Sequence, residues 1–162
     1  METFSGFLRT PIGVLEITTT STSLVSVNFL IDKTFPVISS GSTEILNASI
    51  FQLEEYFSRK RQMFDLPIIA EGTYFQIKVW NKVSEVSFGK TKTYGELAKE
   101  LGSLTLTRAV GTANGSNPIP IIIPCHRVIG SNGKLTGYSG GLWRKQWLLE
   151  HEASNKKLQF IF

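Results

Sequence analysis

The stretch NPIPIIIPCHRVIG, residues 117–130, is the most informative part of the chain. Three prolines bracket a run of isoleucines. Because each proline fixes φ and removes a hydrogen-bond donor, they predict a stiff backbone that is partly irregular. Cys125 follows the last proline and precedes two basic residues, His126 and Arg127, which would favour the thiolate together with a helix starting after Pro124. The segment therefore predicts a reactive thiol, against the alternative of a buried, inert one, which is the more common state of a lone cysteine.

The adjacency of Cys125 and His126 limits how they can cooperate. Neighbouring side chains diverge on a strand and lie about 100° apart around a helix, so a direct thiol–imidazole hydrogen bond is disfavoured. A water molecule between them would solve the geometry. Such a base needs an acid on its far nitrogen, and the candidates are Glu150 and Glu152 on the amphipathic segment 143–152. For Arg127, the alternative is a surface salt bridge or a stem packed on the core.

Two short helices precede this segment. Thr93 is placed to cap a helix over residues 94–101, with Glu96 completing a capping box and Gly102 ending the helix. A second helix is expected from Thr105 to about residue 114. The outline predicts a helix-turn-helix, although an αα-hairpin that only packs is the more common arrangement of such a pair.

Further elements flank this core of the second half. A helix is expected over residues 73–86, with Thr73 as its N-cap and four apolar residues facing inward: Phe75, Val79, Val83 and Val86. Residues 130–141 form a loop whose glycines allow close approach to a flat ligand. Their spacing does not fit a dinucleotide-binding fingerprint.

Residues 1–72 are predicted to be a scaffold of strands and turns. Two strands around a Pro/Gly turn occupy residues 7–18, and a third, over 23–30, pairs with the second of them. A loop over 32–43, a helix over 44–59 and an extended segment over 65–69 follow. No motif in this half carries chemistry. Two domains are expected, 1–72 and 73–162, joined at a linker over residues 70–73.

Composition sets the broad class. The chain has 162 residues, of which 41% are hydrophobic and 19% charged, as in an ordinary folded domain pair. A single cysteine excludes an internal disulfide framework and a multi-cysteine zinc site, and indicates a reducing intracellular compartment. The longest apolar run, 119–124, is too short to span a bilayer, and the N-terminus does not resemble a secretory signal.

Charge is divided unevenly between the halves. Residues 1–72 contain 5 basic and 8 acidic residues, a net charge of −3, whereas residues 73–162 contain 12 basic and 5 acidic residues, a net charge of +7. The C-terminal half is therefore the candidate for a polyanionic partner, with solubility as the alternative explanation.

At these residues the sequence resembles the O6-alkylguanine-DNA alkyltransferases, also called methylated-DNA–protein-cysteine methyltransferases. PCHRVIG at 124–130 matches the active-site signature of that family. The resemblance covers the C-terminal half through GTYFQ (72–76), TYGELA (93–98), RAVG (108–111), NPI (117–119), YSGG (138–141) and LLEHE (148–152). It is weaker in the N-terminal half, at QLEEYF (52–57) and FDLP (64–67).

The resemblance implies catalytic roles for five residues. Cys125 would be the nucleophile and irreversible alkyl acceptor. His126 would act as a base through a water molecule, with Glu152 orienting it. Tyr94 would give a proton or hydrogen bond to the guanine ring as the base leaves, and Asn117 would hold the turn before the active-site segment.

It also implies binding roles. The carbonyls of Cys125 and Val128 would recognise the exocyclic amine of guanine, and the region of Ser139 would bind O6. Arg108, on the second helix of the helix-turn-helix, would fill the gap left by the rotated nucleotide while that helix lies in the minor groove. The remaining residues implied are Tyr138 and Gly140 in the substrate pocket and Thr107, Ala109, Gly111 and Arg127 in DNA binding.

The implied fold is α/β (α+β), with a small N-terminal antiparallel-sheet domain and a C-terminal helical domain containing a winged helix-turn-helix. The implied function is DNA repair by direct, irreversible, stoichiometric transfer of an alkyl group from O6-alkylguanine, and from O4-alkylthymine, in flipped-out nucleotides of double-stranded DNA. No cofactor, no metal and no membrane are expected. A monomer acting at the nucleoid in a prokaryotic cytoplasm is expected.

Three alternatives differ in their chemistry. A lesion-sensing protein that binds without transfer would not need Cys125, and known relatives of that kind lack the cysteine. A transcription regulator would leave the 124–127 segment unexplained. A thiol hydrolase is disfavoured by the adjacency of Cys125 and His126 and by the lack of an evident oxyanion site. The sequence also departs from the family at Ser87, Phe88 and Leu104, which predicts changed helix caps.

Overall fold

The computed structural model describes residues 1–31 and 41–153, so most of the loop expected over 32–43 lies outside the described residues. The chain divides into two compact units, Met1–Glu71 and Gly72–Phe162. The division lies one residue before the expected one. Among the described residues, none of the helices is long and apolar enough to cross a membrane.

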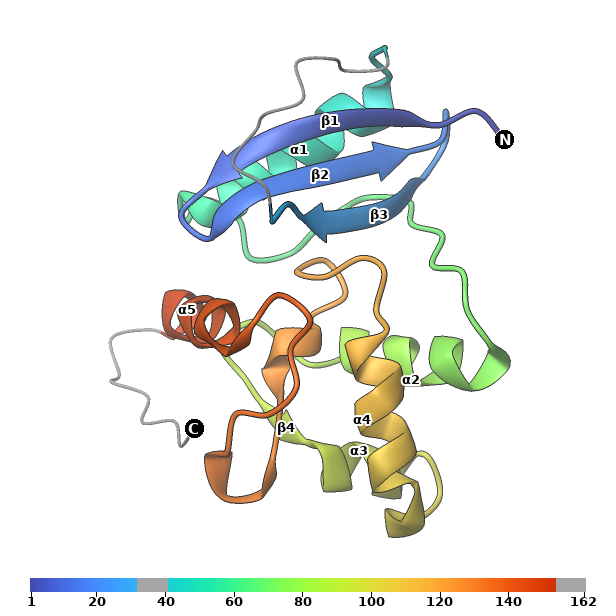
Figure 1. Ribbon diagram of the computed structural model, residues 1–162, viewed down its shortest axis with the longest axis vertical. Coiled ribbons are helices and arrows are strands. Elements are labelled where there is room, and N and C mark those ends of the chain that lie inside the picture. Colours follow the sequence, from blue (N-terminus) through green and yellow to red (C-terminus); the bar gives the residue numbers. More distant parts are fainter. Residues whose placement is uncertain (32–40, 154–162) are drawn as a thin grey trace. The chain divides into compact units, whose positions relative to one another are not determined.

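The N-terminal unit is a three-stranded antiparallel sheet with one helix. Strands β1 (Phe4–Thr10), β2 (Gly13–Thr19) and β3 (Leu24–Phe29) pair in the order β1-β2-β3, and α1 (Glu44–Phe57) lies along one face of the sheet (Figure 1). The register pairs Leu8 with Leu15, which places apolar residues of adjacent strands on the same face. The buried core includes these two leucines together with Ile17, Leu46 and Leu53.

The segment predicted to be extended returns alongside the edge of this sheet. Ile68 forms a parallel bridge with Leu24. The Leu24 N–H donates to the Pro67 carbonyl at 2.8 Å, and the Ile69 N–H donates to the Leu24 carbonyl at 2.9 Å. These bonds partner the free edge of β3 at this point, which limits unwanted edge pairing.

The C-terminal unit begins with α2 (Tyr74–Ser84). Thr73 caps it, and the capping box is reciprocal: the Gln76 N–H donates to the Thr73 hydroxyl and the Thr73 N–H to the Gln76 side chain. The helix is two residues shorter than predicted, because a turn at Glu85 and Val86 closes it. Phe75 was expected to face inward and is only half-buried, because it lies at an open groove.

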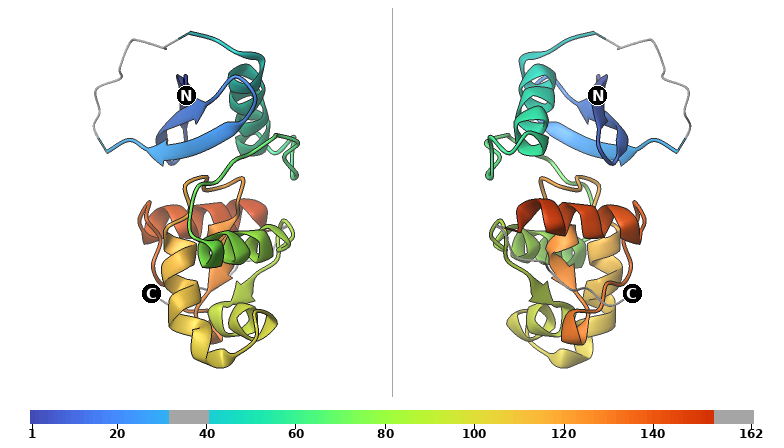
Figure 2. Two further views of the ribbon diagram at one scale, coloured as in Figure 1. Left: turned by 90° about the vertical axis from the view of Figure 1, so that its right-hand side faces the viewer. Right: turned by 90° about the vertical axis from the view of Figure 1, so that its left-hand side faces the viewer.

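The helix-turn-helix consists of α3 (Tyr94–Glu100), a 3₁₀ turn η1 (Leu104–Leu106) and α4 (Thr107–Gly115). The predicted start of the second helix at Thr105 is wrong by two residues, since the Ser103 hydroxyl caps the 3₁₀ turn at Thr105 instead. On α3 the Glu96 N–H donates to the Thr93 hydroxyl, which is one half of the predicted capping box. Figure 2 shows α2 beside α4, where the Trp80 indole N–H donates to the Ala113 carbonyl at 2.8 Å.

A two-residue parallel ladder connects this pair of helices to the segment that contains Cys125. Strand β4 (Lys92–Thr93) pairs with β5 (Val128–Ile129). Just before β5, a single 3₁₀ turn η2 (Cys125–Arg127) replaces the helix expected after Pro124, so a three-residue element provides little helix dipole at the thiol. The 3₁₀ turn η3 (Ser131–Gly133) and α5 (Leu142–Glu152) complete the described chain.

Candidate active site

Asn117 stabilises the irregular segment that leads to the cysteine through two hydrogen bonds. Its side-chain amide donates to the Ile123 carbonyl at 2.7 Å and accepts from the Ile119 N–H at 2.9 Å. Between them Ile121 has a φ of 76°, a left-handed conformation that is strained for a β-branched residue. The buried amide of Asn117 therefore holds a conformation that the segment would not adopt alone. This position matches the turn-holding role expected for Asn117.

Cys125 is 4% exposed and free. Burial raises the pKa of its thiol, while a hydrogen bond from Asn117 and the positive charge of Lys145 act in the opposite direction. A buried thiol of raised pKa needs a base that removes its proton at the moment of reaction.

His126, beside the cysteine in sequence, is fully buried and faces Glu152. Its Nε2 lies 2.7 Å from the Glu152 Oε1, and its Nδ1 has no hydrogen-bond partner among the described residues. Because a carboxylate only accepts, Nε2 carries a proton, and whenever the ring is neutral Nδ1 presents a lone pair. This is the tautomer of a ring that can accept a proton at Nδ1. Of the two acids expected from the sequence, Glu152 takes the orienting position, and Glu150 is exposed and bonded to Gln146.

Arg127 is buried against the same carboxylate. Its Nε donates to the Glu152 Oε2 at 2.9 Å, its NH2 donates to the Oε1 at 2.8 Å, and its NH1 donates to the Val86 carbonyl at 2.7 Å. The guanidinium also lies 5.7 Å from the centre of the Phe88 ring. The expectation that Arg127 contacts DNA does not fit this arrangement, since the guanidinium is turned inward and paired.

The charge of Glu152 is stabilised by these two partners. Burial alone would raise its pKa, but the charge and hydrogen bond of His126, and then the hydrogen bonds and charge of Arg127, together lower it to about 2. The carboxylate therefore remains ionised through the neutral range and orients the imidazole throughout.

Tyr94 reaches the site from the start of α3, because the β4–β5 ladder brings the two segments together. Its hydroxyl donates to the Thr136 carbonyl at 3.1 Å. Burial, the largest influence, raises the pKa of the phenol. The same Thr136 carbonyl accepts from the Lys145 ammonium at 2.9 Å, and Lys145 Nζ lies 3.3 Å from the Tyr94 oxygen.

Lys145 is a site residue that the sequence reasoning missed. It is fully buried on α5, and burial lowers its pKa to about 8, although the nearby Cys125 acts to raise it. A signal was present in the sequence: Lys145, Leu148, Leu149 and Glu152 follow the i, i+3, i+4, i+7 spacing of one helix face, which indicates an inward lysine.

The carbonyl of Cys125 is occupied. It accepts from the Val128 N–H and from the Asn114 side-chain amide, the latter at 3.1 Å. A carbonyl oxygen has two lone pairs, so both acceptor positions are filled. The expectation that the Cys125 and Val128 carbonyls recognise an exocyclic amine stays a prediction, and Asn114 is a second residue that the sequence reasoning missed. Val128, also expected in the substrate pocket, is fully buried.

The residues of the glycine-rich loop, 130–141, differ in their burial. Tyr138 and Gly140 are buried and Ser139 is exposed. Burial, followed by the proximity of Cys125, raises the pKa of Tyr138 well above its usual value. The Gly140 carbonyl accepts from the Arg144 guanidinium at 2.6 Å, which fixes the loop to α5. Gly141, with a φ of 92°, makes the turn into that helix.

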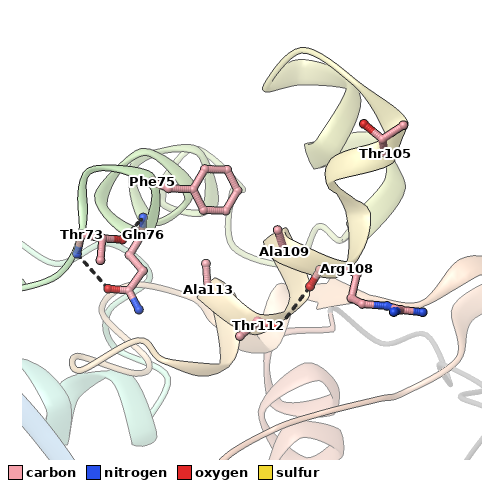
Figure 3. Close-up of a pocket in the computed structure, with 8 residues that line it drawn as sticks. All are labelled: Thr73, Phe75, Gln76, Thr105, Arg108, Ala109, Thr112 and Ala113. Carbon is pink, nitrogen blue, oxygen red and sulfur yellow. Dashed lines mark hydrogen bonds between the residues drawn. The ribbon is translucent and has the colours of Figure 1, made fainter.

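A groove with a volume of about 550 Å³ lies between α2 and α4 (Figure 3). Phe75 faces Ala109 and Ala113 across it, and the Arg108 side chain extends away from Phe75. Thr107 is half-buried. Arg108 and Ala109 are exposed, as residues that contact a partner have to be. Gly111 is half-buried instead, with the Tyr94 ring 3.8 Å from where its side chain would begin. Cys125 is not among the residues that line the groove.

Among residues 1–31 and 41–153 there is no group of three or more His, Cys, Asp or Glu side chains that could hold a metal ion. The polar cluster at the candidate site consists of a thiol, an imidazole bonded to a carboxylate, a phenol and an ammonium. Such a set can remove a proton from sulfur and supply one to a leaving group.

Two family models match the chain. One is described as the DNA binding domain of 6-O-methylguanine DNA methyltransferase and matches residues 74–154; the other is the ribonuclease-like domain of the same family and matches residues 4–70. Among similar proteins, the methylated-DNA–protein-cysteine methyltransferase of Methanosarcina acetivorans is 43% identical over 154 residues, covering 93% of this chain and 99% of the relative. That of Mycolicibacterium paratuberculosis is 43% identical over 145 residues, covering 88% and 87%.

Solved structures agree with these relatives. The O6-methylguanine methyltransferase of Mycobacterium tuberculosis is similar with a TM-score of 0.84 and 37% identity, covering 98% of this chain and 97% of that one. The structure of M. tuberculosis OGT in complex with DNA matches with a TM-score of 0.81 and 40% identity, covering 90% of each chain.

Proposed function

The chain belongs to the 6-O-methylguanine DNA methyltransferase family, and from that premise we propose that Cys125 is the residue that accepts the alkyl group. The protein repairs DNA by alkyl transfer, as the names of its relatives and its likeness to a DNA-bound structure indicate. The observation that carries the assignment is the hydrogen bond of His126 Nε2 to Glu152 at 2.7 Å, which leaves Nδ1 as an acceptor on the residue that follows the only cysteine of the chain.

The transfer step is a displacement at carbon. His126 Nδ1 takes the thiol proton through a water molecule, and the Cys125 sulfur attacks the alkyl carbon of O6-alkylguanine. The sulfur–carbon bond forms as the carbon–O6 bond breaks, and the electron pair of the broken bond goes to the purine, which gains a proton. The product is a thioether without a good leaving group, so each protein molecule acts once. The reaction requires no cofactor.

Tyr94 supplies the proton to the departing purine. In the free protein its hydroxyl donates to the Thr136 carbonyl, so it has to turn towards the base. That carbonyl keeps a donor when Tyr94 leaves, because Lys145 also bonds it at 2.9 Å. Lys145 then stabilises the phenolate left behind, since its ammonium lies within reach of the Tyr94 oxygen.

The helix-turn-helix brings the lesion to this site. We place α4 in the minor groove, with Thr107, Arg108 and Ala109 as contacts, and with Arg108 filling the gap left by the flipped nucleotide. An O6-alkyl group is inaccessible in stacked DNA, and unstacking costs a few kcal/mol, which an inserted side chain offsets in part. The exposed guanidinium of Arg108 supports this role. The protein is proposed to act as a monomer in the cytoplasm, on nucleoid DNA.

The test is a mass measurement. The protein is mixed with duplex DNA carrying one O6-methylguanine, and its intact mass and peptide map are recorded. The expected result is the gain of one methylene mass on the peptide containing Cys125, saturating at one per protein and absent in Cys125→Ser. Tight binding of the lesion without a mass gain would instead identify a damage sensor, and transfer by Cys125→Ser would reject the assignment.

A further inference from the structure

Residues 136–141 form a loop whose two ends are fixed by packing. Leu135, immediately before the loop, is buried in a small apolar cluster with Ile129 and Leu149, and Leu142, immediately after the loop, packs against the same cluster. The chain therefore leaves this cluster and returns to it, as in a compact surface loop with close ends. The middle of the loop can move only when the contacts that hold its backbone are released.

Two consecutive cations of α5 hold that backbone. The Lys145 ammonium donates to the Thr136 carbonyl at 2.9 Å, and the Arg144 guanidinium donates to the Gly140 carbonyl at 2.6 Å. Neighbouring side chains lie about 100° apart around a helix, which allows the two cations to reach opposite ends of the loop. Hydrogen bonds from charged donors are stronger than those from neutral ones, so these two bonds define the position of the loop.

The two ends of the loop are held unequally. Lys145 is fully buried, and the carbonyl that it binds also accepts from the Tyr94 hydroxyl at 3.1 Å. Arg144 is only half-buried, and its guanidinium lies 4.5 Å from the centre of the Trp143 ring, a side chain that is 53% exposed. A hydrogen bond in the interior is stronger than one that water can reach. The end at Gly140 is therefore the one that opens more easily.

The loop lies near the thiol of the proposed reaction. Tyr138, in its middle, is buried; burial raises the pKa of its phenol, and the nearby Cys125 acts in the same direction. Cys125 is itself only 4% exposed, so an alkyl group carried on a purine ring needs more room than this structure gives. The Gly140 end can provide that room, because Gly141 follows it and a glycine backbone has the greatest conformational freedom.

We propose that Arg144 is a specificity-determining residue whose hydrogen bond to the Gly140 carbonyl holds the loop closed and so limits the size of the alkyl group that reaches Cys125. A methyl group requires a small displacement of the loop, and a bulkier group requires release of this bond. Arg144 acts through the loop and is thus a positioning residue. The inference rests on the proposed function for the identity of the substrate, whereas access to the thiol can be measured without DNA.

The first measurement uses the free protein and two thiol reagents with the same reactive group. Iodoacetamide is small, and N-phenyliodoacetamide carries a phenyl ring. Rates of Cys125 modification are followed by intact mass for the wild type, Arg144→Met, Arg144→Lys and Trp143→Ala. The ratio of the two rates cancels any change in the acidity of the thiol. Arg61→Met is the matched control, because Arg61, in the N-terminal unit, also donates to a backbone carbonyl, that of Met63 at 2.9 Å.

Arg144→Met should raise the rate of the phenyl reagent relative to iodoacetamide about fivefold, the effect of losing one hydrogen bond that holds the loop. Arg144→Lys should stay close to the wild type, because it keeps a charged donor. Trp143→Ala should raise the ratio about twofold, because the guanidinium loses the ring on which it stacks. An unchanged ratio in Arg144→Met, or an equal rise in Arg61→Met, would overturn the proposal. If Arg144→Met does not fold, an unchanged ratio in Trp143→Ala overturns it.

The second measurement tests the choice of alkyl group. Single-turnover transfer is recorded from duplexes carrying O6-methylguanine or O6-benzylguanine, for the wild type and for Arg144→Met. The rate with benzyl relative to methyl should rise about fivefold in the variant, because the open loop is more populated. An unchanged ratio would overturn the specificity role. Absence of transfer by the wild type from both duplexes would instead reject the proposed function, while increased labelling by the phenyl reagent in Arg144→Met would still support control of access to the thiol.

Discussion

Arg127 holds both oxygens of the Glu152 carboxylate, with hydrogen bonds of 2.8 and 2.9 Å, while the same carboxylate accepts from His126 at 2.7 Å. One buried acid therefore connects a permanent cation to the imidazole. The guanidinium fixes the carboxylate in charge and in direction, and the carboxylate fixes the imidazole tautomer. We propose that Arg127 positions the His126 ring through the Glu152 carboxylate.

Substitution of Arg127 is expected to reduce both stability and transfer. Arg127→Met removes the guanidinium from a buried carboxylate, so the free energy of unfolding should fall by about 3–5 kcal/mol. The pKa of Glu152 should rise, which moves the acid limit of the transfer rate to higher pH. Urea denaturation and a pH profile of single-turnover transfer measure the two effects. Arg127→Lys should recover part of the stability and part of the acid limit; an unchanged pH profile in Arg127→Met would contradict a positioning role.

Acid should destabilise the protein through Glu152. The pKa of this carboxyl is about 2 in the folded chain and 4.5 for the ordinary group, so the folded state favours the ionised form. The resulting stabilisation of about 3 kcal/mol is complete above pH 4.5 and is lost as the pH falls towards 2. Denaturation between pH 7 and pH 3 should show this loss in the wild type. In Glu152→Gln the slope should be smaller, and equal slopes would disprove the assignment to Glu152.

Lys145 is expected to destabilise the folded state and to increase the rate of transfer. Its pKa of about 8 in the folded chain lies below the ordinary 10.5, so folding disfavours the ammonium form. The penalty is constant below pH 8 and disappears as the pH rises towards 10.5. Lys145→Met is therefore expected to be about 1–3 kcal/mol more stable at pH 7, yet slower in transfer because Tyr94 loses its donor. Thermal denaturation and single-turnover kinetics test both parts, and a variant that is less stable and equally fast would refute them.

Substitution of Arg108 is expected to slow the reaction with duplex DNA and to leave the rate with a free base unchanged. Arg108→Ala is expected to slow repair of O6-methylguanine in a duplex at least tenfold, because nothing then offsets unstacking. The reaction with free O6-benzylguanine should keep its rate, since no nucleotide has to be flipped. Lys99→Ala, an exposed cation on α3, is the matched control for charge. Equal losses with the duplex and the free base would show that Arg108 acts on the site itself.

The predictable features of this chain were local ones. The N-caps at Thr73 and Thr93 are predictable because a hydroxyl residue at the start of an apolar helical pattern has a nearby partner in sequence. The sequence also reduces the acid partner of His126 to two candidates, since few acids lie in the C-terminal half and only two lie on the last helix.

The features that could not be predicted depend on contacts distant in sequence. The β4–β5 ladder is only two residues long, so it has no periodicity to detect, yet it brings Tyr94 to the cysteine. Asn114 and Arg127 find their partners across irregular backbone, 11 and 25 residues away. Neither distance is encoded by a helix or strand repeat, and a charged residue such as Arg127 or Lys145 is ordinarily expected at the surface.

Every hydrogen bond described at the candidate active site joins residues between Val86 and Glu152, within one of the two compact units. A single contiguous segment of the gene therefore encodes every residue described at the candidate active site. Recombination that exchanged the sequence of the N-terminal unit would leave Cys125, His126 and Tyr94 in one segment. The N-terminal unit and the segment that contains the candidate active site can therefore evolve separately.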